Sequence, residues 1–381
     1  MTAVEGVRAR PRMAHALAPA GVYLGVRAVG VAVLALMAGP ARLVPELTSW
    51  DAAWLLAIAG HGYDGVPAHM VDAFGNHTRD TATGFFPGYP ALVAALGVFT
   101  GGNLGVAGLL VSALAGVAAA YGISRIGELV PGGSRRAGLL LTALFAATPM
   151  SVVLSMAYTE ALFCALAAWA LVCVLQERWL LAGFCAAGAG LVRPTASAVV
   201  GAVGLAALVA VLDRRHGWRP WAGGLLAVSG LLGYLGWVAL RTGEPDGWFR
   251  VQRSGWGWYL DGGAATALYL ARVLAGGERV FELVTVLALA GSLVLLGVAV
   301  ARRTPWPLLA YAALALMSVW GTHGLMNAKL RLLVPAFVLL VPVATGLARR
   351  RPTTAVAVVV AAALTSAWFG GYALTTWRYG I

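Results

Sequence analysis

Thr48-Ser49-Trp50-Asp51-Ala52-Ala53-Trp54 is the stretch that follows the first long apolar run of the chain. Ser49 or Thr48 is expected to cap a short helix here, because a hydroxyl accepts hydrogen bonds from free backbone N–H groups. Asp51 then lies in the first turn, where the helix dipole favours a negative charge. Two interpretations remain open: Asp51 either completes the helix start and does nothing more, or it carries chemistry.

The same helix is predicted to lie along the membrane surface. Trp50, Trp54 and Ile58 recur at a spacing of four residues, so one face of the helix is apolar and aromatic. Tryptophan is enriched where a bilayer meets water, and an amphipathic helix lies in that plane. Asp51 is therefore expected at the boundary between lipid and water.

Composition indicates the class of protein. Apolar residues make up 60% of the 381 residues and charged residues 11%, against about 45–50% and 25% in soluble domains. Several apolar runs reach or approach the roughly 20 residues that cross a bilayer. The sequence predicts an all-α polytopic membrane protein that forms a single integral membrane domain over residues 1–381.

Charge and cysteine content exclude other classes. The net charge is +12, but the basic residues are spread in short groups between apolar runs, so nucleic-acid binding is not expected. Cys164, Cys173 and Cys185 all lie within apolar runs and match no disulfide framework or metal pattern. Lys329 is the single lysine among 27 basic residues. That bias towards arginine, with abundant Ala, Gly and Val, is typical of a GC-rich bacterium.

About eleven transmembrane helices are predicted, with surface helices in the first outer loop. The approximate spans are residues 16–39, 104–123, 137–153, 158–175, 180–193, 194–212, 221–240, 281–300, 306–320, 332–347 and 354–375. Arg193-Pro194 divides two of them, because proline disfavours helix in the residue before it. The first outer loop covers about 40–103 and includes a short surface or re-entrant helix near 88–100.

The second outer loop, about 241–280, is expected to be irregular up to 263 and then to hold a surface helix. Orientation follows from the basic residues before Arg193. If the N-terminus is cytoplasmic, Arg42 and Arg79 lie outside, and the seven that lie inside are Arg8, Arg10, Arg12, Arg125, Arg135, Arg136 and Arg178. This predicts a multi-pass protein of the bacterial plasma membrane with both large loops extracytoplasmic.

Further charged residues are expected on the outer face. Glu160 opens a span, and Arg193 lies in an apolar run where it needs a partner. Either the two residues pair structurally, or Arg193 holds an anionic ligand. Lys329 and Arg331 open another span, where the helix dipole disfavours cations, and a bound phosphate is expected to compensate them. Helix-end stabilisation for Glu160 and interfacial anchoring for the two cations are the competing interpretations.

A metal site is possible but is not predicted. His61, His69 and His77 recur at a spacing of eight residues, with Asp72 and Asp80 nearby. These residue types bind divalent metals, but the spacing matches no zinc pattern. Solvated loop histidines are the simpler interpretation, and no cofactor is assigned.

The outer set of charges suits a substrate with a lipid tail and a phosphate head. If a sugar is attached through that phosphate, the phosphate leaves as a stable anion, so the reaction needs one base and no strong general acid. Positive charge must receive the departing phosphate. Attack from the opposite face would invert the sugar. Asp51 is predicted to be the base.

Five motifs resemble, in order, those of PIG-V-type mannosyltransferases, the family of GPI mannosyltransferase II and its actinobacterial relatives. They are Trp50-Asp51-Ala52-Ala53-Trp54, Phe85-Phe86-Pro87-Gly88-Tyr89-Pro90, Tyr158-Thr159-Glu160-Ala161-Leu162-Phe163, Arg193-Pro194-Thr195 and Lys329-Leu330-Arg331-Leu332-Leu333-Val334-Pro335-Ala336-Phe337. Leu55 departs from the family where a Tyr is expected, and Leu332 departs where an aromatic residue is common. Both departures leave the sugar and the acceptor open.

The resemblance implies a GT-C glycosyltransferase fold and a polyprenyl-phosphate-linked sugar, mannose in the family, as donor. It implies catalysis on the extracytoplasmic face, with Asp51 as base and Glu160 as an acid near the active site. The acceptor is expected to be a lipid, glycan or protein other than GPI. Residues predicted to bind substrate are Trp50, Trp54, Tyr89, Tyr158, Arg193, His323, Lys329 and Arg331.

A transporter or permease of a lipid-linked or small anionic substrate is the alternative function. It is expected to place charges or broken helices near the middle of the membrane, with a repeat that relates its halves. Arg27 is the single charge expected there, because the other inferred intramembrane charges lie near one face. The sequence therefore favours the glycosyltransferase.

Overall fold

The structure is a computed structural model that describes residues 6–276 and 279–381, with side chains described from His15 onward. It is almost entirely helical, as predicted. Five helices are long and apolar enough to cross a membrane: α1 (Gly6–Ala38, with its apolar part at His15–Ala38), α5 (Leu104–Leu129), α10 (Arg219–Thr242), α13 (Val280–Ala301) and α17 (Pro352–Thr375). The chain is a multi-pass membrane protein.

Shorter apolar helices complete the bundle. They are α4 (Gly88–Gly97) with η3 (Val98–Thr100), α7 (Glu160–Leu175), α8 (Trp179–Gly190), α9 (Ala196–Leu212), α12 (Ala264–Gly276), α14 (Trp306–Trp320) and η5 (Val334–Leu340) with α16 (Val341–Ala348). The remaining elements are η1 (Pro40–Arg42), α2 (Leu43–Leu47), α3 (Asp51–His61), η2 (Thr81–Gly84), α6 (Arg135–Ala146), η4 (Ser151–Leu154), α11 (Gly247–Trp256), α15 (Ala328–Leu332), β1 (Tyr259–Leu260) and β2 (Thr322–His323).

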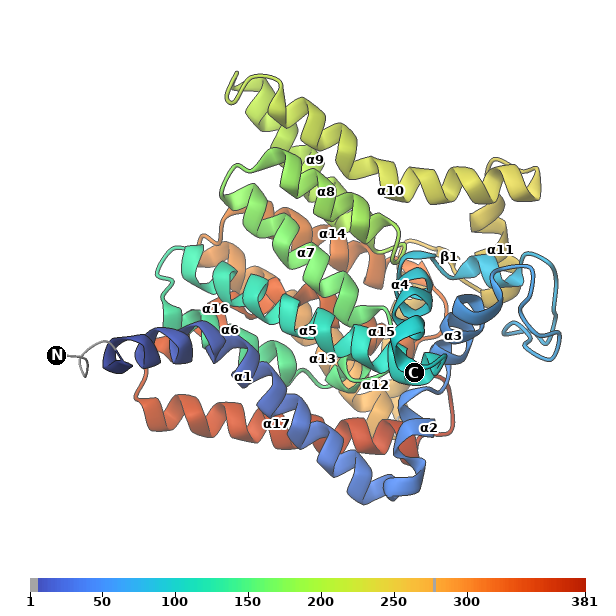
Figure 1. Ribbon diagram of the computed structural model, residues 1–381, viewed down its shortest axis with the longest axis horizontal. Helices are drawn as coiled ribbons and strands as arrows, with labels where there is room; N and C mark the ends of the chain where they lie inside the picture. Colours follow the sequence, from blue (N-terminus) through green and yellow to red (C-terminus); the bar gives the residue numbers. More distant parts are fainter. Residues whose placement is uncertain (1–5, 277–278) are drawn as a thin grey trace.

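Figure 1 shows α3, α4 and α11 gathered at one end of the bundle, and the N-terminus at the other. Helices α1 and α17 lie side by side along one edge, and α8, α9 and α10 pack together at the opposite edge. Glycines allow α8 and α10 to approach closely: a Cβ on Gly230 would lie 1.9 Å from the carbonyl oxygen of Ala187. Small residues are the usual means of close helix packing in lipid.

Proline interrupts two predicted spans. The span expected at 137–153 ends as α6 at Ala146, three residues before Pro149, and continues as the short helix η4. The span expected at 332–347 is divided into η5 and α16, which contain Pro335 and Pro342. Proline removes a backbone donor and clashes with the preceding turn, so neither stretch forms one continuous α-helix. The break at Arg193-Pro194 is confirmed, because α8 ends at Gly190 and α9 begins at Ala196.

The segment 241–280, predicted to be the second outer loop, is more regular than expected. Residues 247–256 form α11, where the abundance of Trp and Gly had predicted irregular structure. Trp248 packs edge-to-face against Phe86 of the first outer loop, with ring centroids 5.7 Å apart. This long-range contact stabilises the helix. The local sequence also alternates apolar and polar residues with the period of an amphipathic helix, a signal that the prediction overlooked. The surface helix expected after residue 263 is confirmed as α12.

The predictions for the start of α3 are partly wrong. Thr48 and Ser49 do not cap this helix: their hydroxyls donate to the carbonyl oxygens of Val44 and Glu46 in the preceding turn. Trp50 occupies the cap position with a φ of 57°, and its side chain makes no capping hydrogen bond. The short helix α2, which was not predicted, uses these hydroxyls to close its own end.

The apolar face of α3 is covered by protein instead of lying on the membrane. Trp54 and Ile58 are buried with Val66 and Ala82 of the first outer loop, while Trp50 remains 43% exposed. The loop carries apolar side chains of its own. It folds back over α3 because these side chains are removed from water when they pack against the helix. Asp51 lies at the start of the helix, at the edge of this packed region.

Candidate active site

Four charged side chains form one ion-pair cluster. Arg331 Nη2 lies 2.6 Å from Asp51 Oδ2, and Arg331 Nε lies 4.0 Å from Glu160 Oε1. Arg193 Nη1 lies 2.9 Å from the same oxygen of Glu160. The structure therefore brings together four residues that the sequence predicted for one site. Their charges sum to zero, two positive and two negative.

Helix ends position all four residues. Asp51 opens α3 and Glu160 opens α7, where the positive end of the helix dipole stabilises a carboxylate. Arg193 lies in the turn between α8 and α9, and Arg331 lies in the short helix α15. The competing interpretation of both acids as helix-end residues also holds, because dipole stabilisation and ion pairing act on the same carboxylates.

Tyr158 connects the two sides of the cluster. Its hydroxyl oxygen accepts a hydrogen bond from the backbone N–H of Asp51 at 3.2 Å, and the guanidinium carbon of Arg331 lies 5.3 Å from its ring centroid. Its carbonyl oxygen accepts from the hydroxyl of Ser112 at 3.3 Å. Tyr89 is completely buried; its hydroxyl donates to the carbonyl oxygen of Gly108 and lies 2.9 Å from the hydroxyl of Ser112. Tyr89 is therefore connected to Tyr158 through Ser112.

The cluster is buried on one side and open on the other. Glu160 is 1% exposed and Arg193 7%, whereas the side chain of Asp51 is 34% exposed. Three buried guanidinium nitrogens of the cluster have no hydrogen-bond partner of suitable geometry within the described residues: Nε and Nη1 of Arg193 and Nε of Arg331. Arg193 Nη1 nevertheless forms the ion pair with Glu160 at 2.9 Å. Buried donors are nearly always satisfied in folded proteins, and guanidinium groups pair strongly with phosphate oxygens. These donors fit an anionic ligand.

Three predicted substrate-binding residues have their partners outside the cluster. Trp54 stacks on Phe85 with ring centroids 5.5 Å apart, and His323 stacks on Tyr259 at 4.6 Å. The amine of Lys329 donates to the backbone carbonyl oxygens of Val319, at the end of α14, and of Thr322 in β2. Within the protein, carbonyl groups therefore compensate the charge of Lys329, and carboxylates compensate that of Arg331.

Arg241 is a structural residue that the sequence did not single out. Its Nη2 lies 2.7 Å from Asp64 Oδ1 and its Nε 3.0 Å from Asp80 Oδ1, so it ties the first outer loop to the end of α10. The hydrogen bond from Arg241 lowers the pKa of Asp64. An arginine more than 150 positions from its acids has no local signal in the sequence that would reveal the pairing.

The histidine-rich part of that loop is occupied with its own hydrogen bonds. His77 Nδ1 lies 2.7 Å from the carbonyl oxygen of Met70, and Asp72 Oδ1 accepts from the backbone N–H groups of Phe74 and Asn76. Across residues 6–276 and 279–381, no group of three His, Cys, Asp or Glu residues is placed to hold a metal ion. No metal is proposed.

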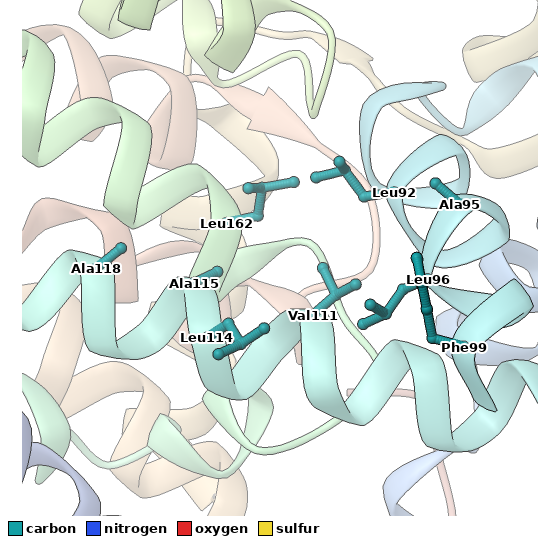
Figure 2. Close-up of a pocket in the computed structure, with 9 residues that line it drawn as sticks. All are labelled: Leu92, Ala95, Leu96, Phe99, Val111, Leu114, Ala115, Ala118 and Leu162. Atoms are coloured by element: carbon teal, nitrogen blue, oxygen red, sulfur yellow. The ribbon is translucent and has the colours of Figure 1, made fainter.

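An apolar groove of about 400 Å³ is lined by residues of α4, η3, α5 and α7. Figure 2 shows the side chains of Leu92 and Leu162 pointing toward each other across it. Leu162 lies two residues after Glu160 on α7, so the groove and the cluster share this helix. A wholly apolar groove on a membrane helix suits a hydrocarbon chain.

No family model matches the chain, and no curated protein matches it. Two solved structures are similar over almost its whole length. ArnT from Cupriavidus metallidurans, bound to undecaprenyl phosphate, aligns with a TM-score of 0.56 and 14% identity over 92% of this chain and 76% of its own. The archaeal oligosaccharyltransferase AglB from Archaeoglobus fulgidus, in complex with an inhibitory peptide and a dolichol-phosphate, aligns with a TM-score of 0.51 and 14% identity over 93% and 56%.

This chain has the GT-C glycosyltransferase fold. At 14% identity the likeness establishes the GT-C fold and leaves the chemistry to the residues described above. In this GT-C fold the ion-pair cluster joins the first outer loop to α7, α15 and the turn after α8.

The buried pair of Glu160 and Arg193 is expected to stabilise the GT-C fold strongly. Replacing Glu160 by Gln leaves the guanidinium of Arg193 buried without its nearest carboxylate, and breaking a buried ion pair costs about 3–5 kcal/mol. The measurement is denaturant unfolding in mixed micelles. Glu128→Gln is the matched control, because its pair with Arg125 is partly exposed and such pairs contribute about 0–1 kcal/mol. Equal losses in the two variants would contradict the assignment.

Lys329 is expected to make stability depend on pH. Burial lowers the pKa of its amine from 10.5 to about 8. Below pH 8 the amine is charged in both folded and unfolded chains, and burying the charge costs stability; between pH 8 and 10.5 the folded chain releases its proton first. Stability contributed by this group therefore rises with pH across that window. The free energy of unfolding, measured between pH 8 and 10.5, should rise with pH in the unaltered protein and should rise less in Lys329→Met. Parallel pH profiles of the two proteins would contradict this.

Proposed function

We propose that this protein is a membrane glycosyltransferase that moves a sugar from a polyprenyl-phosphate donor to an acceptor hydroxyl. The observation that carries the proposal is the half-exposed carboxylate of Asp51 next to buried guanidinium N–H groups with no partner. A base beside an anion-binding pocket is what transfer from a sugar phosphate requires. The shared fold of two proteins whose structures hold polyprenyl or dolichyl phosphate supports the choice of donor.

Asp51 is the proposed general base. Its Oδ2 is held by Arg331, and Oδ1 is proposed to accept the proton of the acceptor hydroxyl. The acceptor oxygen then forms a bond to the anomeric carbon of the sugar. The bond from that carbon to the phosphate oxygen breaks, and its electron pair stays on the phosphate. Attack from the face opposite the phosphate inverts the sugar.

Arg193 and Arg331 are the proposed phosphate-binding residues. Their Nε groups are buried donors. Arg193 Nη1 and Arg331 Nε lie 2.9 and 4.0 Å from the same oxygen, Oε1 of Glu160. Glu160 is therefore proposed to hold the two guanidinium groups in place, which explains an acid so close to an anion site. Preorganised donors stabilise charge without having to reorient during the reaction.

The charge of the cluster matches the course of this reaction. Before transfer, the two arginines and two carboxylates are neutral together. When Asp51 takes a proton the cluster gains a net charge of +1, at the moment when the phosphate gains negative charge. The electrostatic stabilisation thus grows towards the transition state, which is the condition for catalysis.

The donor and setting follow from the motifs. Mannose is proposed as the sugar, because the five motifs resemble those of PIG-V-type mannosyltransferases. The site is proposed to face the extracytoplasmic side of a bacterial plasma membrane, following the distribution of basic residues. The apolar groove between α4 and α5 offers a surface for a lipid chain of the donor or acceptor.

The test is transfer of label in membranes. Membranes that contain the protein are incubated with polyprenyl phosphate carrying radiolabelled mannose, and membranes with an Asp51→Asn variant serve as the background. We expect a labelled product other than the carrier to accumulate only with the unaltered protein. Identical labelling in both would contradict the proposal. A signal from glucose or arabinose carriers, with none from mannose, would retain the glycosyltransferase and replace the sugar.

A further inference from the structure

Arg27 carries a positive charge in the middle of a membrane helix. It lies halfway along the apolar part of α1, His15–Ala38, and only 6% of the residue is exposed. An ionisable residue at this depth costs several kcal/mol unless it is satisfied, and it usually serves a function. The proposed transfer reaction does not use it, since it lies outside the cluster.

Its guanidinium group donates hydrogen bonds to the segment that leads from α6 to α7. Nη1 donates to the carbonyl oxygen of Ala146 at 3.0 Å and to the hydroxyl of Ser151 at 2.5 Å, and Nε donates to the hydroxyl of Ser155 at 2.9 Å. Ala146 is the last residue of α6, where the negative end of the dipole favours a cation. No acid pairs with Arg27 among the described residues.

At its other end the same segment contacts Asp51 and the helix that precedes it. The N–H of Ala157 donates to the carbonyl oxygen of Leu47 at 3.0 Å, and Tyr158 Oη accepts from the N–H of Asp51 at 3.2 Å. Glu160 follows two residues later. Residues 146–160, which we call the strut, thus connect Arg27 in α1 to the ion-pair cluster.

We propose that Arg27 is a positioning residue for the candidate active site, which acts through this strut. By fixing residues 146, 151 and 155, it determines where Tyr158 and Glu160 stand relative to Asp51. The break in helix after α6 makes this necessary, because a segment without a continuous helical hydrogen-bond ladder needs other partners to hold its shape. The inference rests on the proposed function for its catalytic meaning, but its structural part stands alone.

The structural part is tested by hydrogen–deuterium exchange on the purified full chain. Arg27→Met removes the donors and keeps an apolar side chain of similar length. We expect amide exchange at residues 147–159 and 47–53 to accelerate about tenfold or more, the equivalent of losing a hydrogen bond to a charged group. Arg27→Lys should restore part of the protection. Arg125→Met, at an exposed ion pair on α5, is the matched control and should change neither region.

The catalytic part is tested by a double-mutant cycle in sugar transfer. Arg27→Met and Tyr158→Phe are each expected to lower kcat/KM, and the double variant is expected to fall no further than the worse single variant, because both break the same strut. Losses that multiply would show independent, merely structural effects and overturn the positioning role. If Arg27→Met does not fold, Ser155→Ala, which removes one acceptor, replaces it in both experiments.

The outcomes separate this proposal from the function itself. Unchanged exchange at residues 147–159 and 47–53 overturns the role of Arg27 whether or not the protein transfers sugar. Accelerated exchange in a protein that transfers no sugar from any polyprenyl-phosphate carrier retains the strut and removes the glycosyltransferase.

Discussion

Asp51→Asn is expected to abolish sugar transfer while leaving the protein folded. Asn has nearly the same shape as Asp but cannot take the proton of the acceptor hydroxyl, and a general base contributes about 10²–10⁴-fold to the rate. In this variant Arg331 still has a carboxylate nearby, because its Nε lies 4.0 Å from Glu160 Oε1. The proposed phosphate-binding arginines should therefore keep their positions. We therefore expect kcat to fall by about three orders of magnitude with donor binding preserved.

Asp64→Asn is the matched control for this variant. Asp64 is an aspartate of the same outer loop and is likewise paired with an arginine, at 2.7 Å, but it is largely exposed and lies outside the cluster. Its loss should change turnover by no more than a few-fold, since exposed ion pairs contribute about 0–1 kcal/mol. Normal turnover in Asp51→Asn would remove this carboxylate from the mechanism.

Arg331→Ala is expected to have the second-largest effect, and on a different kinetic parameter. The variant loses the guanidinium that holds Asp51 Oδ2 and presents the unpartnered Nε towards the proposed phosphate site. Removing one preorganised charge-stabilising group typically costs about 10²–10³-fold in kcat. Donor affinity should also fall, because ground-state phosphate contacts are lost. Titration with polyprenyl phosphate in nanodiscs, alongside steady-state kinetics, measures both.

Two further arginine variants sharpen this test. Arg331→Lys retains the charge but not the planar pair of donors, so it should recover little activity. Arg79→Ala removes an arginine whose pair with Asp64 is highly exposed, and it should leave both donor affinity and kcat within about twofold. Donor affinity and turnover that are unchanged in Arg331→Ala would refute the phosphate role.

The membrane class and most helices could be predicted from the sequence because hydropathy is a local property. Every long apolar run forms a helix, and the turn at Arg193-Pro194 follows from the geometry of proline alone. The errors have two causes. Trp54 is buried because Val66, Ala82 and Phe85 pack on it, and such contacts are absent from a local window. Other errors overlooked local signals: prolines interrupt two predicted spans, and residues 247–256 carry the period of an amphipathic helix.

The candidate site could likewise be predicted only in part from the sequence. Asp51, Glu160, Arg193 and Arg331 were predicted as one set, because charge in apolar surroundings is costly enough to mark a residue wherever it occurs. Lys329 carried the same signal, yet the fold directs its amine to backbone carbonyl oxygens. Arg241 gave no such signal, since it lies in the last turn of α10, where a basic residue is ordinary.

By itself, then, the sequence determined a helical membrane protein with an acidic outer loop and a small set of costly charges. Only the tertiary structure decided which charges meet: Arg331 between two carboxylates, Lys329 against carbonyl groups, and Arg27 against the strut below Tyr158. The physical reason is the length of chain on which each property depends. Whether a segment enters the membrane depends on the hydropathy of a local run of about twenty residues. An ion pair depends on a few ångströms between atoms whose positions are fixed by the packing of the whole bundle.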